Sequence, residues 1–149
     1  MRRNLGESDV TLSDYRALAE FRYQIRRYLA FSDKAAEDAG LRSKQYQLLL
    51  SLKGLPEGVD ATITNLAERL GTRHHSTVEL VDRLEKRGLV KRERSDVHRS
   101  FVFVRITPNG EKMLRKLVAS RKTDLQVYGP ILVKTLTTLT KEAAKRKKS

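Results

Sequence analysis

The chain has 149 residues, of which 31 are Lys or Arg and 18 are Asp or Glu, so its formal net charge is +13. A positive excess of this size implies attraction to polyanions such as nucleic acid or an anionic membrane surface. The absence of cysteine excludes disulfides, a thiol nucleophile, a thiolate zinc site and cysteine-based oxidant sensing. With 39% hydrophobic residues and no long apolar run, we expect one cytoplasmic globular domain without a membrane span or secretory signal.

The first part of the chain predicts two amphipathic helices. Over residues 11–31, apolar side chains recur at spacings of three and four, which is typical of a helix with a broad apolar stripe. A second helix is expected over Ser43–Lys53, because Gly54 can close it and Pro56 prevents its continuation.

Two shorter helices are expected next. Thr62 is a good N-cap for the first of them, which should stop at Gly71. Its apolar stripe consists of Ile63, Leu66, Ala67 and Leu70. The second should begin near His75 and end at Gly88, where glycine suits the C-terminal cap.

A strand pair follows these helices. Val90–Arg94 and residues 100–106 are expected as strands, because β-branched, aromatic and basic residues alternate in the second of them. The polar residues 95–99 between them form the tip of the resulting hairpin.

The remainder of the chain predicts two more helices. Thr107 and Pro108 suit the capping and first positions of a helix. We expect the pair Gly129-Pro130 to break this helix, and a last helix to lead into a basic tail over residues 141–149.

This order of elements is typical of a winged helix-turn-helix, and four segments resemble the MarR (multiple antibiotic resistance regulator) family. They are NLAERLG, STV, LVDRLEKRGLV and ITPNG, at residues 65–71, 76–78, 80–90 and 106–110. Several ordered blocks at fixed spacing are a more specific signal than any lone motif. The segment QYQLLL at residues 45–50 also looks like the second helix of the family.

The resemblance implies a mainly α fold with a small antiparallel β-wing. Residues 1–149 would form a single domain with a winged helix-turn-helix part at 41–110, flanked by dimerisation helices at 11–31 and 108–146. Such a homodimer would bind double-stranded DNA at a pseudo-palindromic operator, with half-sites one helical turn apart. By resemblance, the chain is a sequence-specific transcriptional repressor released by a small-molecule effector.

The N-terminus of the second short helix holds the strongest candidates for contact with DNA. A helix fits the major groove, where residues of its first turn reach base edges and its backbone amides favour phosphate. The candidates are Arg73, His74, His75, Ser76 and Thr77. In the alternative interpretation, Ser76 and Thr72 only cap the helix and Thr77 packs inward.

Charged residues further along the same helix have a simpler explanation as ion pairs. Glu79 with Arg83 and Asp82 with Lys86 are each four residues apart, which is typical of solvated helix pairs. We favour that interpretation for Asp82 and Lys86. Arg83 stays a candidate DNA contact, because it flanks the reading face and could leave Glu79 to contact phosphate.

The hairpin adds further candidates for contact with the narrow minor groove, namely Arg94, His98 and Arg99. By resemblance, Arg99 takes the place of the arginine usual in the wing of the family. Asp96 would turn the loop or orient Arg99, since the neighbouring residues differ from the usual Asp-x-Arg-Arg pattern.

No pattern in the sequence supports a metal, a cofactor or an enzyme activity. His74 and His75 are adjacent, so on a helix they point about 100° apart, and no carboxylate or cysteine completes a site. Nucleophile elbows, phosphate-binding glycine loops and cofactor fingerprints are all missing.

Three points stay open at the level of the sequence. An effector pocket, by resemblance, would lie between the dimerisation helices and the winged part, with Tyr15, Arg22, Arg26 and Tyr46 as candidates. The same four residues could instead belong to the core or an interface. The chain could also be a non-specific architectural DNA-binding protein, or a winged-helix module whose basic wing meets an acidic protein.

Overall fold

The computed structural model describes the backbone of residues 6–97 and 101–148, and the side chains up to residue 141. The chain divides into two compact units. The winged unit comprises residues 33–120, and the helical unit comprises residues up to 32 together with those from 121 onward.

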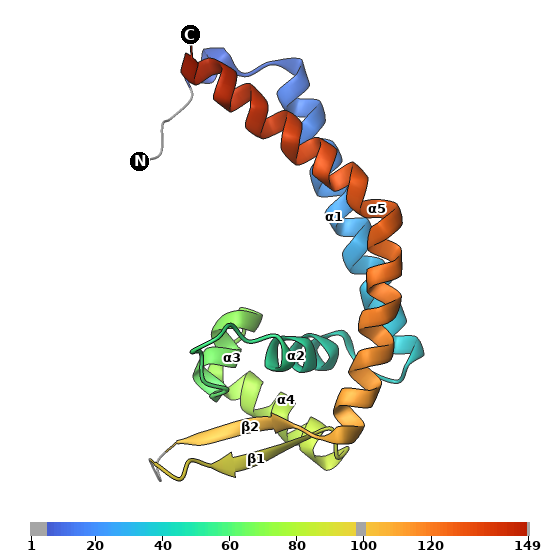
Figure 1. Cartoon of the computed structure of the whole chain (residues 1–149), viewed down its shortest axis with the longest axis vertical. Helices are drawn as coiled ribbons and strands as arrows, with labels where there is room; N and C mark the ends of the chain where they lie inside the picture. Colours follow the sequence, from blue (N-terminus) through green and yellow to red (C-terminus); the bar gives the residue numbers. More distant parts are fainter. Residues whose placement is uncertain (1–5, 98–100, 149) are drawn as a thin grey trace. The chain divides into compact units, whose positions relative to one another are not determined.

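The described elements occur in the predicted order (Figure 1). After the short 3-10 turn η1 (Glu7–Asp9), they are α1 (Leu12–Asp38), α2 (Ser43–Lys53), α3 (Ile63–Leu70), α4 (His74–Lys86), β1 (Val90–Arg94), β2 (Val102–Ile106) and α5 (Pro108–Lys148). The predicted mainly helical fold with an antiparallel wing is confirmed. No helix in the described ranges is long and apolar enough to cross a membrane.

The core of the winged unit is built from the apolar stripes of its short helices. Leu48 and Leu49 of α2, Leu66 of α3 and Leu84 of α4 are completely buried, and they pack in one cluster with Val104 of β2. Full burial of each such side chain is worth about 1.5–3 kcal/mol relative to its exposure to water. The core therefore fixes α3 and α4 against the wing.

Local caps set the ends of α3. The Thr62 hydroxyl accepts a hydrogen bond from the Asn65 amide at 3.2 Å, so the predicted N-cap is confirmed. Gly71 takes a left-handed conformation (φ +63°) after the last turn, which residues with a Cβ adopt at a cost. The chain can therefore turn sharply into α4.

The wing pairs Arg92 of β1 with Val104 of β2 in an antiparallel register. The free edge of β2 is bound at one point, where the Val104 amide donates to the Ala61 carbonyl at 2.8 Å. This bond joins the wing to the loop that precedes α3.

Two predicted boundaries are wrong. The first helix continues to Asp38, beyond its expected end at residue 31, and α5 continues through Pro130 without the predicted break. A proline inside a helix removes one backbone hydrogen bond, which packing on the same helix can outweigh. The Tyr128 ring stacks on Phe31 of α1 at 5.6 Å between centroids, and the Arg27 guanidinium lies 5.2 Å from the Tyr128 centroid. These contacts hold α5 beside α1 close to Pro130.

The start of α5 is locked to the end of α4. The Thr107 hydroxyl donates to the Gly88 carbonyl at 2.6 Å and accepts from the Gly110 amide at 3.1 Å, while the Thr107 amide donates to the Leu89 carbonyl. A Cβ on Gly110 would lie 2.1 Å from the Leu89 carbonyl oxygen. Only glycine therefore allows this close approach.

We expect Gly110→Ala to lower the free energy of unfolding by about 1–3 kcal/mol, because the added methyl group meets backbone atoms that cannot yield easily. Gly129→Ala is the matched control. It also lies in α5, but outside its chain neighbours and the backbone of the helix its Cβ would have no atom within 4 Å. Because the gain in helix propensity is opposed by the restriction that Pro130 places on the residue before it, the change in the free energy of unfolding should stay below about 1 kcal/mol. Urea unfolding of the two variants measures both effects, and an unaltered midpoint for Gly110→Ala would contradict the packing at this junction.

Candidate nucleic-acid interface

The first turn of α4 presents an exposed, uncapped helix end. Arg73 is the N-cap residue and has no side-chain capping bond, and the side chains of Arg73, His74, His75 and Ser76 are exposed. Within the described part of the chain, no acceptor bonds the amides of His74, His75 and Ser76. These amides and the positive end of the helix dipole suit a phosphate group.

Thr77 does not belong to this exposed group. Its side chain is completely buried, and its hydroxyl donates to the Arg73 carbonyl at 3.0 Å and lies 2.8 Å from the Thr72 hydroxyl. The prediction that Thr77 contacts DNA is therefore wrong for its side chain, and the alternative, in which it packs inward, holds. Thr72 also bonds toward Thr77 instead of capping the first turn.

The predicted pair between Asp82 and Lys86 is also wrong. Asp82 instead accepts from the Arg92 guanidinium at 2.6 Å. The ion pairs of the described residues do not include one between Glu79 and Arg83 either, and Arg83 is exposed. Arg83 can therefore reach a phosphate without first leaving a carboxylate.

Arg92 joins the wing to α4, a role that the sequence interpretation missed. Its guanidinium contacts Asp82 and also Glu85 at 3.0 Å, while its backbone amide donates to the second Glu85 oxygen at 2.9 Å. Its side chain is only 27% exposed, so solvent screens these contacts less than it screens a surface pair. The signal in the sequence is two carboxylates three residues apart on α4, followed by a cation in the next strand.

Carboxylates partly neutralise the remaining charge of the strands. Glu93 lies 3.0 Å from Lys91 and 3.4 Å from Arg105. The hydrogen bond from Lys91, together with the charges of Lys91 and Arg105, holds the pKa of Glu93 below its ordinary value. Arg94 is exposed on β1 with no ion pair among the described residues. His98 and Arg99 lie outside the described residues.

The predicted effector residues fall in different units. Tyr46 is buried in the core of the winged unit, whereas Tyr15, Arg22 and Arg26 are exposed on α1 in the helical unit. The position of Tyr46 agrees with the alternative that it is a core residue. Among the described residues, no group of three or more His, Cys, Asp or Glu side chains could hold a metal ion.

The fold and the exposed end of α4 define a winged helix-turn-helix protein with long flanking helices. A family model described as the MarR family matches residues 39–99, which include α2, α3, α4 and β1. Residues 39–99 are therefore similar to the MarR family, and the chain has the fold of a solved member of that family.

Two curated relatives from Bacillus subtilis match parts of the chain. The chain is 42% identical over 55 residues to YfiV, an uncharacterized HTH-type transcriptional regulator. This match covers 37% of the present chain and 34% of YfiV. The chain is 29% identical over 77 residues to YsmB, a second uncharacterized HTH-type transcriptional regulator. This match covers 52% of the present chain and 53% of YsmB. The matched parts thus span about a third to a half of these relatives. Both relatives are transcriptional regulators by name.

Solved structures match over most of the chain. AbsC of Streptomyces coelicolor, a MarR family transcriptional regulator, has a TM-score of 0.66 at 20% identity and 99% coverage of both chains. CouR of Rhodococcus jostii RHA1, solved with p-coumaroyl-CoA, has a TM-score of 0.62 at 25% identity, covering 80% of this chain and 82% of CouR. A MepR variant of S. aureus, solved with an oligodeoxyribonucleotide, has a TM-score of 0.62 at 18% identity. The match covers 84% of this chain and 94% of the MepR variant.

We expect Arg92→Met to lower the free energy of unfolding by about 1–3 kcal/mol, because it leaves two carboxylates and a half-buried site without their cation. Lys91→Met is the matched control on the same strand. Its pair with Glu93 is exposed on both sides, so its loss should cost about 0.2–1 kcal/mol. Equal losses in urea unfolding would show that Arg92 is an ordinary surface cation.

Proposed function

We propose that the chain is a homodimeric, sequence-specific DNA-binding regulator that acts in the cytoplasm as a repressor and is released by a small-molecule effector. The observation that carries this proposal is the exposed, uncapped first turn of α4, with Arg73, His74, His75 and Ser76 beside a basic wing. Arginine can bond two acceptors of guanine, and imidazoles and hydroxyls can serve bases or phosphate. By analogy, the DNA-bound MepR variant supports DNA binding, and CouR bound to p-coumaroyl-CoA supports control by a small molecule.

Dimerisation is supported by apolar side chains that the helical unit leaves exposed. They lie on α1 and α5 and include Tyr15, Leu18, Leu29, Val127, Val133 and Leu136. A monomer rarely exposes so many large apolar groups unless a partner covers them. A two-fold dimer would present two α4 helices to the half-sites of one operator.

Selection of bound duplexes from a random pool at physiological salt tests the proposal. A regulator should enrich one pseudo-palindromic site with half-sites one helical turn apart, and bind it about 10³-fold or more tightly than random DNA. Binding without enrichment would instead indicate an architectural protein. Absence of binding to any duplex at low salt would indicate a protein-interaction module.

Arg73→Ala or His75→Ala should weaken binding mainly at particular base pairs, by about 1–3 kcal/mol on the selected duplex. Lys86→Ala is the control, because Lys86 is exposed at the opposite end of α4. Fluorescence anisotropy on the selected duplex and on single-base variants measures the effect. If the loss is the same on every sequence, the two residues contact phosphate instead of bases.

Arg99→Ala should weaken binding and reduce the slope of log affinity against log salt by about one, as expected when one phosphate contact is lost. The dimer should remain folded, which analytical ultracentrifugation verifies. Unaltered affinity across the salt series would remove Arg99 from the interface.

A further inference from the structure

Arg87, the residue that directly follows α4, binds the turn between α1 and α2. Its guanidinium nitrogen Nη1 donates to the Gly40 carbonyl at 2.8 Å and to Gln45 Oε1 at 3.2 Å. These two acceptors lie 47 and 42 residues away in the sequence. One side chain at the end of α4 therefore bridges the turn that follows α1 and the first turn of α2.

Both acceptors are held in place by further bonds. Gly40 has a φ of +84°, and the Leu41 amide donates to the Ala36 carbonyl at 2.8 Å, which closes the end of α1. Gln45 is buried, and its Oε1 also accepts from the Arg42 amide at 3.1 Å. The two acceptors are thus in position before the guanidinium binds them.

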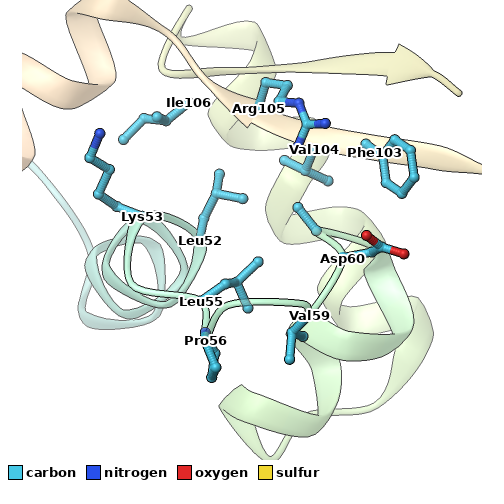
Figure 2. Close-up of a pocket in the computed structure, with 11 residues that line it drawn as sticks. Leu52, Lys53, Leu55, Pro56, Val59, Asp60, Phe103, Val104, Arg105 and Ile106 are labelled. Atoms are coloured by element: carbon cyan, nitrogen blue, oxygen red, sulfur yellow. The ribbon is translucent and has the colours of Figure 1, made fainter.

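A second bridge joins α1 to the same turn of α2. The Ser43 hydroxyl donates to Asp33 Oδ1 and accepts from Gln47 Nε2 at 2.9 Å. At the other end of α2, the Leu52 side chain points toward β2 and lies in one core cluster with Val104 (Figure 2). Within the winged unit, the end of α1, α2 and the end of α4 are therefore held together.

The bridge leaves the positive charge of Arg87 without a carboxylate. Both acceptors are neutral, and the ion pairs of the described residues do not include one with Arg87. An exposed cation on a DNA-reading helix could instead bind phosphate. The two roles are distinguishable, because only a phosphate contact releases counterions and adds to the salt dependence of DNA binding.

We propose that Arg87 is a positioning residue for DNA recognition, which fixes α4 to the end of α1 without contacting DNA itself. This role rests on the proposed function. The helix α1 begins in the helical unit and ends in the winged unit, so it leads from the proposed dimer interface to the turn that Arg87 binds. The bridge would hold the two α4 helices of a dimer at the spacing of one operator, and a preformed spacing lowers the cost of binding.

The test compares the selected duplex with a copy lengthened by one base pair between the half-sites, which rotates one half-site by about 35°. Arg87→Met removes the donors, and fluorescence anisotropy is measured at a temperature where this variant is fully folded. The variant should bind the selected duplex about two- to thirtyfold more weakly. It should lose less affinity for the lengthened duplex, because α4 is held less firmly at one spacing, and its salt slope should be unaltered.

Two outcomes of this measurement would overturn the proposal. If the ratio of the affinities for the two duplexes is the same as in the wild type, Arg87 does not set the spacing. If the slope of log affinity against log salt falls by about one, Arg87 contacts phosphate instead.

Two further variants separate the bridge from the charge. Lys86→Met removes a neighbouring exposed cation and should leave the ratio of the two affinities unaltered, so an equal change in this variant would overturn the assignment to Arg87. Arg87→Lys keeps the charge, but its ammonium ends one bond short of Nη1. It should lower the ratio as Arg87→Met does, and a wild-type ratio would show that the charge alone is sufficient and would overturn the bridge.

Hydrogen exchange of the full chain tests the bridge without DNA. Arg87→Met should speed exchange of the Leu41 and Arg42 amides about two- to tenfold, as expected when a hydrogen bond that supports them is lost, and Lys86→Met should not. Unaltered exchange in Arg87→Met would overturn the bridge. If the wild-type chain enriches no duplex, the proposed function fails and the positioning role fails with it, while hydrogen exchange still decides the bridge.

Discussion

The ion-pair network of Arg92 is the contact on which the geometry of the candidate interface depends. β1 and α4 are joined by a short turn, and the core buries only one face of each. Arg92 contacts Asp82 and Glu85 through its guanidinium and Glu85 again through its backbone amide, so it fixes both the position and the direction of the strand. Because the carboxylates belong to the helix and the cation belongs to the wing, the two elements behave as one body toward a ligand.

In the first turn of α4, the residues that bond within the protein are different from those that face solvent. Thr77 and Thr72 bond each other beneath the helix end, which stabilises the turn without using the amides of the first turn. Arg73 to Ser76 are thereby left exposed. A serine or aspartate cap would have satisfied an amide and weakened the attraction of this end for phosphate. The structure therefore has an open site where a helix usually has a cap.

Much of this fold is predictable from local rules, and the errors arise where packing decides. Thr62 as a cap and Thr107 with Pro108 as a helix start depend on bonds within a few residues, and the sequence contains both partners. The predicted helix break at Pro130 is wrong, because the local cost of the proline is outweighed by contacts between α5 and α1 that no local sequence pattern contains. The predicted ion pair between Asp82 and Lys86 is wrong for a related reason. Lys86 is the neighbour of Asp82 on the helix, whereas Arg92 comes within reach of Asp82 only when β1 folds back along α4. The candidate site was located by resemblance and helix position, and only burial separates Thr77 from its exposed neighbours.

In the proposed regulator, Arg92 holds the wing and α4 as one body toward DNA without contacting DNA itself. The most direct measurement is the affinity of Arg92→Met for the selected duplex over a salt series, at a temperature where the variant is fully folded. We expect a lower affinity with an unaltered salt slope, because the variant loses the geometry of the interface but no phosphate contact. Unaltered affinity would contradict this role of Arg92, and a salt slope reduced by about one would show that Arg92 contacts phosphate instead.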